Sequence, residues 1–406
     1  MAFSGLSFPT LEYGSRVRNT KITAHLPGIV ASNGTFEYRV MRAAYTRYIF
    51  TIPAWKFTWS DREALLAFWN QVGGRLLSFL WKDADYNSFS NAAIGTGTQL
   101  AVPGAPTVTN DLKAGTLPLG TYNITVTALN AQGETTASAQ TATTLSLDPP
   151  PPTLSASTAA GTLVAGTYTY GLVFHTATGY SVLGTTAAIT TTATGEVGLS
   201  WTLPANVTSV DVYGRVAGSL GLLASGLTGT SWTDDGSVTP GAAAPATATV
   251  TGEIASSWTA VNGATSYNIY RNNALAGSTT GTTFTDQGAG TGGAAPTING
   301  TGVTTFPLVV PVAGQLHPIW HPDDTQTVDA GGVGLSGWTV QIVNQQPAVV
   351  FPLGSCPLYG DAVTTSGGFS FAVRFNNDLA YVLLNAAQPQ WGPSALDALE
   401  MMEVFE

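Results

Sequence analysis

An internal repeat whose two copies are interleaved constrains the fold of this chain more than any other feature. Residues 114–122 (AGTLPLGTY) return as residues 160–168 (AGTLVAGTY), and the motif TGE at residues 194–196 returns at residues 251–253. The aromatic residues after each TGE motif keep the same offsets: Trp201 and Tyr213, then Trp258 and Tyr270. Two further pairs match: 229–234 with 281–286, and 242–245 with 293–296.

The order of these matches indicates nesting rather than a tandem array. One copy runs intact from about residue 151 to 245, whereas the other begins near residue 105, stops near 147 and resumes near 246. One domain is therefore predicted to be inserted inside its own twin. Loop tips tolerate insertion, because the termini of a domain often lie close together.

The predicted organisation has five segments. A core domain is made of the two ends of the chain, and it is interrupted by an outer module that is itself interrupted by an inner one. The boundaries are as follows: 1–103, core, first segment; 104–148, outer module, first half; 149–245, inner module; 246–296, outer module, second half; 297–406, core, second segment. Four prolines at residues 149–152 form a stiff linker into the inner module.

Both modules are predicted to be small β-sandwiches. Alternate residues are apolar at the same places in the two copies: Tyr122, Ile124, Val126 and Ala128, then Tyr168, Tyr170, Leu172 and Phe174. Such alternation between glycine-rich turns favours short strands. Trp201 and Trp258 are expected to anchor the two cores, together with Tyr213 or Tyr270.

The outer segments predict a β-rich domain with one helix. Residues 55–59 alternate like a strand, and Ser60 with Glu63 forms a capping box that opens a helix ending at Gly73 and Gly74. Residues 76–81 are expected to return as a strand. Residues 369–375 alternate and, after a turn at 376–378, pair with 381–384 in a predicted hairpin; the tail 395–405 is expected to dock on the core or on a neighbour.

The balance of charge excludes some functions. The net charge of -10 argues against specific nucleic-acid binding, and no apolar run is long enough for a membrane span. Residues 1–5 do not resemble the start of a signal peptide, so assembly in the cytoplasm is expected. Ten of the fourteen basic residues lie in residues 1–100, whereas Arg374 is the one basic residue in the last hundred. These are either two solvated faces of one domain or a head-to-tail contact between subunits.

Few residues suggest chemistry. His317 and His321 have metal-ligand side chains, but Pro318 and Pro322 disfavour a helical pair, and a structured loop is the preferred interpretation. Asp234 and Asp235 are interpreted as a turn rather than a calcium site. Cys356 is single, and a small buried residue is its expected role. No nucleophile elbow or phosphate loop is present, so no enzyme activity, catalytic residue, metal or cofactor is predicted.

Two terminal motifs resemble a known family. Residues 8–14 (FPTLEYG), 65–69 (LLAFW) and 74–83 (GRLLSFLWKD) are similar to one end of it, and residues 337–340 (GWTV) and 368–375 (GFSFAVRF) to the other. The family is that of the distal tail (baseplate) proteins of long-tailed bacteriophages and gene transfer agents. The two inserted modules resemble fibronectin type III or immunoglobulin-like domains.

The resemblance implies a fold and a set of partners. The fold would be mainly β: a ring-forming tail core with one α-helix, interrupted by two nested β-sandwich modules. The protein would be a structural virion protein at the tail tip, forming a homo-hexameric ring that connects the tail tube protein to the tail-tip hub protein, with the modules projecting outward. Interface residues are expected among the charged positions of the core: Arg39, Arg42, Arg47, Arg75, Lys82, Asp83, Arg374 and Asp378.

An alternative function places the activity in the modules. Fibronectin-like modules with aromatic residues are also typical of adhesins that bind host-surface carbohydrate. Most aromatics of the modules repeat at matching positions, which favours core packing. Tyr180 is aligned with Ala131 and Gln132 of the twin and is therefore the candidate for surface recognition.

Overall fold

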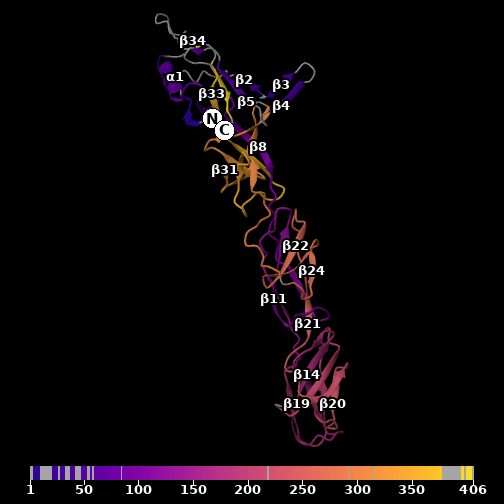
Figure 1. The fold of residues 1–406 in the computed structure, drawn as a ribbon. Helices are drawn as coiled ribbons and strands as arrows, with labels where there is room; N and C mark the ends of the chain where they lie inside the picture. The colour runs from indigo at the N-terminus through magenta and orange to yellow at the C-terminus, as the bar shows by residue number, and fades with distance from the viewer. Residues whose placement is uncertain are drawn as a thin grey trace. The chain divides into compact units, whose positions relative to one another are not determined.

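The computed structural model describes residues 3–9, 21–25, 28–32, 37–41, 47–52, 55–56, 59–83, 85–216, 219–290, 292–312, 314–376, 395–396 and 399–404. The protein is mainly β, as the sequence predicts. It divides into two compact units. Unit 1 contains residues Met1–Gln99 and Gly302–Glu406, and unit 2 contains residues Leu100–Thr301. Both ends of the chain thus belong to unit 1 (Figure 1).

The main sheet of unit 1 mixes strands from both ends of the chain. Its central path runs in the order β1 (Phe3–Ser7), β7 (Ser78–Trp81), β33 (Ala362–Phe375), β35 (Leu399–Glu403), β5 (Arg47–Ile52), β2 (Lys21–His25). The long strand β33 also pairs with β8 (Ser88–Thr96), β28 (His321–Pro322) and β29 (Thr327–Ala330), and β29 pairs with β30 (Val333–Leu335).

Smaller sheets complete unit 1. One has the order β25 (Thr305–Pro307), β32 (Gln346–Val350), β31 (Thr339–Val343). The others are pairs: β3 (Gly28–Ser32) with β4 (Glu37–Met41), β26 (Val309–Val312) with β27 (Gln315–Pro318), and β6 (Trp55–Lys56) with β34 (Ala395–Leu396).

The helix α1 (Trp59–Gln71) packs on the main sheet through an apolar face. Leu65, Phe68 and Val72 are buried, and the Phe68 ring meets Phe79 of β7 edge-on at 4.9 Å. The predicted end is confirmed: Gly73 and Gly74 both have positive φ, and their amides donate to the Asn70 and Trp69 carbonyls. That pairing is a Schellman motif, which glycine adopts without strain.

Two expectations for unit 1 need correction, and a third, which left two docking sites open for the tail, is settled. Trp59 is helical rather than the end of a strand, and the helix begins before Ser60; five alternating residues are too few to separate a strand from a first helical turn. The strand expected over 76–81 begins only at Ser78. The tail docks on its own unit, where β35 lies between β33 and β5. The hairpin partner at 381–384 lies outside the described residues.

Unit 2 contains two sandwiches with matching strand pairing. In one, a sheet of β13 (Thr153–Ser157), β17 (Glu196–Ser200) and β20 (Ser231–Asp234) faces a sheet of β16 (Ala187–Thr191), β14 (Gly166–Thr176), β18 (Ser209–Val216) and β19 (Ser219–Leu227), to which β15 (Gly179–Tyr180) adds. Their strands pair only among themselves, and this is the inner sandwich.

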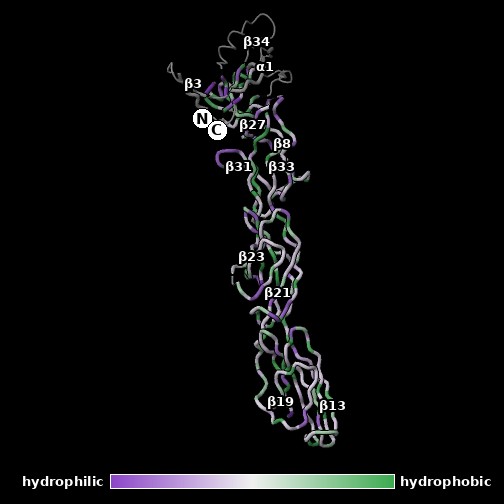
Figure 2. The backbone as a smooth tube through the Cα atoms, turned by 90° about the vertical axis from the view of Figure 1, so that its right-hand side faces the viewer, coloured by the Kyte–Doolittle hydropathy of each residue, from purple (hydrophilic) through white to green (hydrophobic). Residues whose placement is uncertain are grey.

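The outer sandwich is built from strands on both sides of the inner one. One sheet has β9 (Thr107–Asp111), β21 (Thr251–Ser257) and β24 (Thr283–Asp286), with β10 (Leu117–Pro118) beside β21. The other has β12 (Thr141–Leu145), β11 (Gly120–Leu129), β22 (Ser266–Arg271) and β23 (Ala274–Thr279). Hydrophobic and hydrophilic residues succeed each other at short intervals along these strands (Figure 2).

The registers of most strand pairs correspond residue by residue in the two sandwiches, but β18 and β19 have a register shift between Val210 and Val212 that β22 and β23 lack. Val197 pairs with Asp234 in one, and Ile254 pairs with Asp286 in the other. Trp201, Trp258, Tyr213 and Tyr270 are all buried, as the repeat predicts. The connectivity has one notable difference from immunoglobulin constant domains, whose first two strands are neighbours. Here the first long strand pairs with the fourth, because β13 pairs with β17 and β9 with β21.

Candidate functional site

The two terminal motifs meet as neighbouring strands in unit 1. Strand β7 pairs antiparallel with β33, so that Trp81 lies opposite Phe371 and Phe79 opposite Val373. Behind them the rings of Phe8, Phe68, Phe79 and Phe375 form a contiguous aromatic core. Two segments nearly 300 residues apart in sequence thereby make one packed element.

A buried polar cluster fastens the last strand into the sheet. Glu403 of β35 is 2% exposed, and its carboxylate lies 2.6 Å from Nε2 of His317 and accepts the backbone amide of Tyr48 at 3.0 Å. The Tyr48 hydroxyl donates to the carbonyl of Val312. Burial, and then the charge of Glu403, raises the pKa of Tyr48 to about 12. The phenol therefore stays neutral, and it acts as a hydrogen-bond donor.

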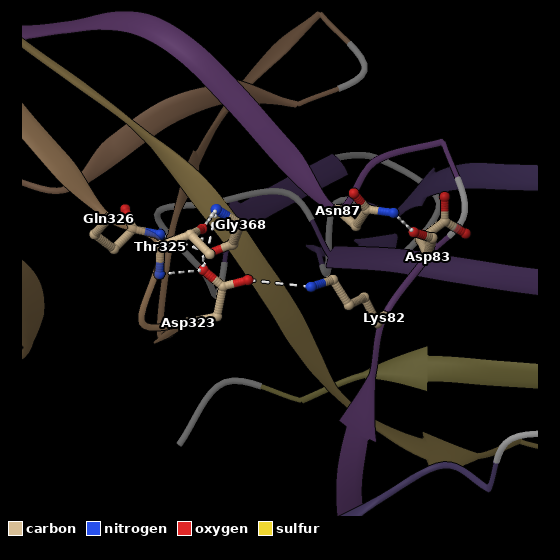
Figure 3. A network of polar contacts seen from close by, with 7 residues as sticks. All are labelled: Lys82, Asp83, Asn87, Asp323, Thr325, Gln326 and Gly368. Carbon is tan, nitrogen blue, oxygen red and sulfur yellow. Dashed lines mark hydrogen bonds and ion pairs between the residues drawn. The ribbon is translucent and has the colours of Figure 1, made fainter.

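An exposed polar network joins the same terminal segments (Figure 3). The Lys82 ammonium lies 3.1 Å from the Asp323 carboxylate, which also accepts the amides of Thr325 and Gly368. Burial alone would raise the pKa of Asp323, but the hydrogen bonds from Thr325 and Lys82 outweigh it and lower that pKa to about 2. The carboxylate is therefore charged throughout the physiological range.

The charged residues expected at an interface take several different places. Lys82 is paired within the chain, and Asp83 is buried, where it accepts the amides of Asp85 and Tyr86. Arg75 is exposed after the helix, whereas Arg47 and Arg374 are half-buried in β5 and β33. Arg39 belongs to β4, but its side chain is not described, and Arg42 and Asp378 lie outside the described residues.

Unit 1 exposes apolar side chains that sequence reasoning did not single out. Of the exposed large hydrophobic residues in the described part of the chain, eight belong to unit 1 and four to unit 2. Those of unit 1 are Leu76, Tyr86, Leu316, Val333, Ile342, Leu353, Leu358 and Tyr359. Ile342 is 58% exposed on β31, an edge strand with no charged residue and no proline. Such an edge lacks the usual protection against pairing with another chain.

Tyr180 has a different twin from the one the sequence alignment suggested. In the structure Tyr180 pairs with His175, and the equivalent bridge in the outer sandwich joins Leu129 to Glu134. The counterpart of Tyr180 is therefore Glu134 and not Ala131 or Gln132. The offset of 46 residues that relates the preceding strands simply continues through this turn.

The residues considered for chemistry have structural partners. His317 and Pro318 belong to β27 rather than to a loop, and no group of three or more potential metal-ligating residues occurs within the described ranges. Asp234 is buried, and its carboxylate makes two hydrogen bonds with Arg215. Cys356 is buried as expected, and burial raises the pKa of its thiol. No helix in the described part of the chain is long and apolar enough to cross a membrane.

Comparison with known proteins adds no relative. No protein-family model matches the sequence, and neither a curated protein nor a solved structure does. The geometry and the sequence motifs are thus the basis for a functional proposal.

Proposed function

We propose that the protein is a structural virion protein, a subunit of a ring at the distal end of a bacteriophage tail. Unit 1 would form the ring, a homo-hexamer in contact with the tail tube protein on one side and the tail-tip hub protein on the other. Unit 2 would project outward from that ring. No catalytic residue, metal or cofactor takes part in this function.

One observation carries the proposal. The two sequence motifs that resemble distal tail proteins come from opposite ends of the chain, and they lie side by side as β7 and β33. A resemblance split between distant segments is more specific when those segments build one sheet. The motifs then describe a single domain into which unit 2 is inserted.

The surface of unit 1 has features that favour assembly with other copies of the protein. Its exposed apolar residues and its uncharged edge strand β31 are features that a solitary soluble domain usually avoids. Charge contributes as well, because the first hundred residues contain ten of the fourteen basic residues, whereas the last hundred contain nine acidic residues and one basic residue. Opposite charges of this kind set the register of head-to-tail contacts.

Immunogold electron microscopy of intact virions tests the location. Antibodies raised against the full-length protein are expected to label the tail tip and to leave capsids and tail shafts unlabelled. Labelling of capsids, or virions whose tail tips stay unlabelled, would rule the proposal out.

A further inference from the structure

The two sandwiches differ at one shared place, the outward face of the four-stranded sheet beside the first β-turn. The register defines five equivalent pairs there: Leu129 and His175, Glu134 and Tyr180, Thr127 and Val173, Asn268 and Asp211, Tyr270 and Tyr213. The pairing of β14 with β18 corresponds to that of β11 with β22, so the side chains of these pairs can be compared directly. The backbones differ beside Asp211, where β18 has a register shift toward β19.

In the outer sandwich this cluster is closed. The Glu134 carboxylate accepts the Tyr270 hydroxyl at 2.7 Å, the Asn268 amide at 3.0 Å and the Thr127 hydroxyl. Each of these donors therefore has its acceptor, the Glu134 carboxylate, within the module. Such a saturated network has little capacity left for a ligand.

In the inner sandwich the same cluster is open. Tyr180 replaces Glu134, so that Tyr213 loses the acceptor that its twin Tyr270 uses. Neither the Tyr213 hydroxyl nor the Tyr180 hydroxyl has a hydrogen-bond partner in the part of the chain that the structure describes. Tyr213 is only 6% exposed as a residue, but its hydroxyl is not fully buried, so it reaches solvent and is free to form a hydrogen bond with a ligand.

The remaining side chains of the inner cluster supply an acceptor and a ring. Asp211 lies 2.9 Å from His175 Nε2 and accepts the Gly226 amide, which leaves lone pairs on both carboxylate oxygens. The His175 ring, with 31% of its side chain exposed, lies 5.7 Å from the Tyr180 ring at an angle of 52°. The charge of Asp211 and the phenol of Tyr180 both act on Tyr213 and, after burial, raise its pKa, as expected for groups gathered in one place.

The charge of unit 2 limits the kind of ligand. The unit contains nine acidic residues and three basic ones. Arg215 and Arg271 are held in ion pairs with Asp234 and Asp286, and Lys113 lies 3.8 Å from Asp111. An anionic ligand would therefore be repelled rather than attracted by this surface.

We propose that Tyr180, Tyr213, His175 and Asp211 form a binding site for a neutral carbohydrate. Aromatic rings pack against the apolar face of a sugar, while phenol hydroxyls and a carboxylate hydrogen-bond its hydroxyl groups. The site adds host-surface recognition to the ring function proposed above, and it stands on different residues and a different unit.

A glycan array probed with the full-length protein tests the site. The array carries neutral oligosaccharides of bacterial surfaces, with sialylated and sulfated glycans for comparison. Binding is expected to neutral glycans alone. Absence of binding to every neutral glycan, or preference for the acidic ones, would overturn the proposal.

The twin supplies the decisive variant. Tyr180→Glu removes the Tyr180 ring and gives Tyr213 the acceptor that Tyr270 has, although Val173 and Asp211 stand where the outer cluster has the donors Thr127 and Asn268. Its affinity for the bound glycan is expected to fall at least tenfold. Tyr168→Phe is the matched control, since Tyr168 belongs to the same sheet and donates to Val164 instead.

A loss of folding is separated from a loss of binding by the same set of variants. Tyr168→Phe is expected to keep the thermal unfolding temperature of unit 2, and Tyr180→Glu is expected to stay folded with a lower unfolding temperature, because its carboxylate shares the cluster with Asp211. His175→Ala weakens binding without closing the site. Equal glycan affinity in Tyr180→Glu and the parent protein would refute the assignment.

Discussion

The inner and outer sandwiches share most of their strand registers but not their polar interiors. In both, a buried aspartate at the end of the last strand is paired with an arginine, at 2.6 Å in each case. The two aspartates are 52 residues apart in sequence, and the two arginines are 56 apart. Equivalent residues of their host strands β18 and β22 are 57 apart, so the two arginines do not occupy equivalent positions, although they bind equivalent aspartates. The two copies of this repeat thus keep similar strand registers, whereas their polar side chains differ.

The difference also extends to the second partner of each aspartate. Asp234 of the inner sandwich accepts the hydroxyl of buried Tyr170, but the twin of Tyr170 is Ile124. Burial, together with the charge of Asp234, raises the pKa of Tyr170, which keeps that hydroxyl a donor. One module therefore holds its aspartate with three side-chain hydrogen bonds, and the other relies on the arginine.

The largest expected effect tests whether the two modules are separate cores. Trp258→Ala and Trp201→Ala each remove a buried ring and are expected to cost about 3–5 kcal/mol of stability. Hydrogen exchange with mass spectrometry should show Trp258→Ala opening both halves of the outer sandwich, β9–β12 and β21–β24. Trp201→Ala should open β13–β20. If both variants expose the same peptides, the modules form one cooperative unit and the comparison fails.

A loss of similar size is expected when either ion pair is broken, and a smaller difference distinguishes the two pairs. Arg271→Met leaves the buried Asp286 with the Gly288 amide, and a loss of about 3–5 kcal/mol is expected. Arg215→Met leaves Asp234 with the Tyr170 hydroxyl and the Gly236 amide, so its loss should be about 1 kcal/mol smaller. Urea denaturation of the two variants measures the difference. Equal losses would mean that the Tyr170 hydroxyl contributes nothing to holding Asp234.

Tyr170→Phe tests that hydroxyl directly. Its removal should destabilise the inner sandwich by about 1.5–3 kcal/mol, the range for a hydrogen bond to a charged group. Tyr168→Phe serves as the control, because its hydroxyl bonds a carbonyl at an exposed site. Exchange rates in β14 and β20 report the effect, and unchanged rates in Tyr170→Phe would contradict the proposed role.

The smallest expected effect is a pH-dependent change in the stability of unit 1. The folded pKa of Asp323, about 2, lies below its ordinary value of 3.8, so the charged carboxylate stabilises unit 1 above pH 4. That contribution is lost as the pH falls from about 4 to 2. Because Lys82 is more than half exposed, Asp323→Asn should cost only about 1 kcal/mol at pH 7. Thermal unfolding at pH 7 and pH 2 checks this, and a deficit that persists at pH 2 would contradict it.

The sequence repeats predict unit 2 well because they are local signals of a shared backbone. The Gly-Thr-Tyr and Thr-Gly-Glu motifs recur with fixed offsets, and the structure aligns their strands in the same registers. The error at Tyr180 arose in a turn where the residues differ and only spacing remains. The bridge between Leu129 and Glu134 identifies Glu134 as the counterpart of Tyr180, and extending the offset of 46 residues through the turn gives the same assignment.

Unit 1 was harder to predict because its sheet is assembled from distant segments. No local pattern indicates that β35 inserts between β33 and β5, since that position depends on contacts across the whole chain. The buried contact between Glu403 and His317 follows from that insertion. A histidine followed by a proline and a glutamate near the end of an acidic tail give no sign of it.

Electron microscopy of the purified full-length protein, with its mass in solution measured by light scattering, tests the central claim most directly. Self-assembly of unit 1 predicts rings with a central hole and a mass six times that of the 41.9 kDa chain. A monodisperse particle with the mass of one chain, and no rings at any protein concentration, would contradict the claim that unit 1 is a ring-forming subunit.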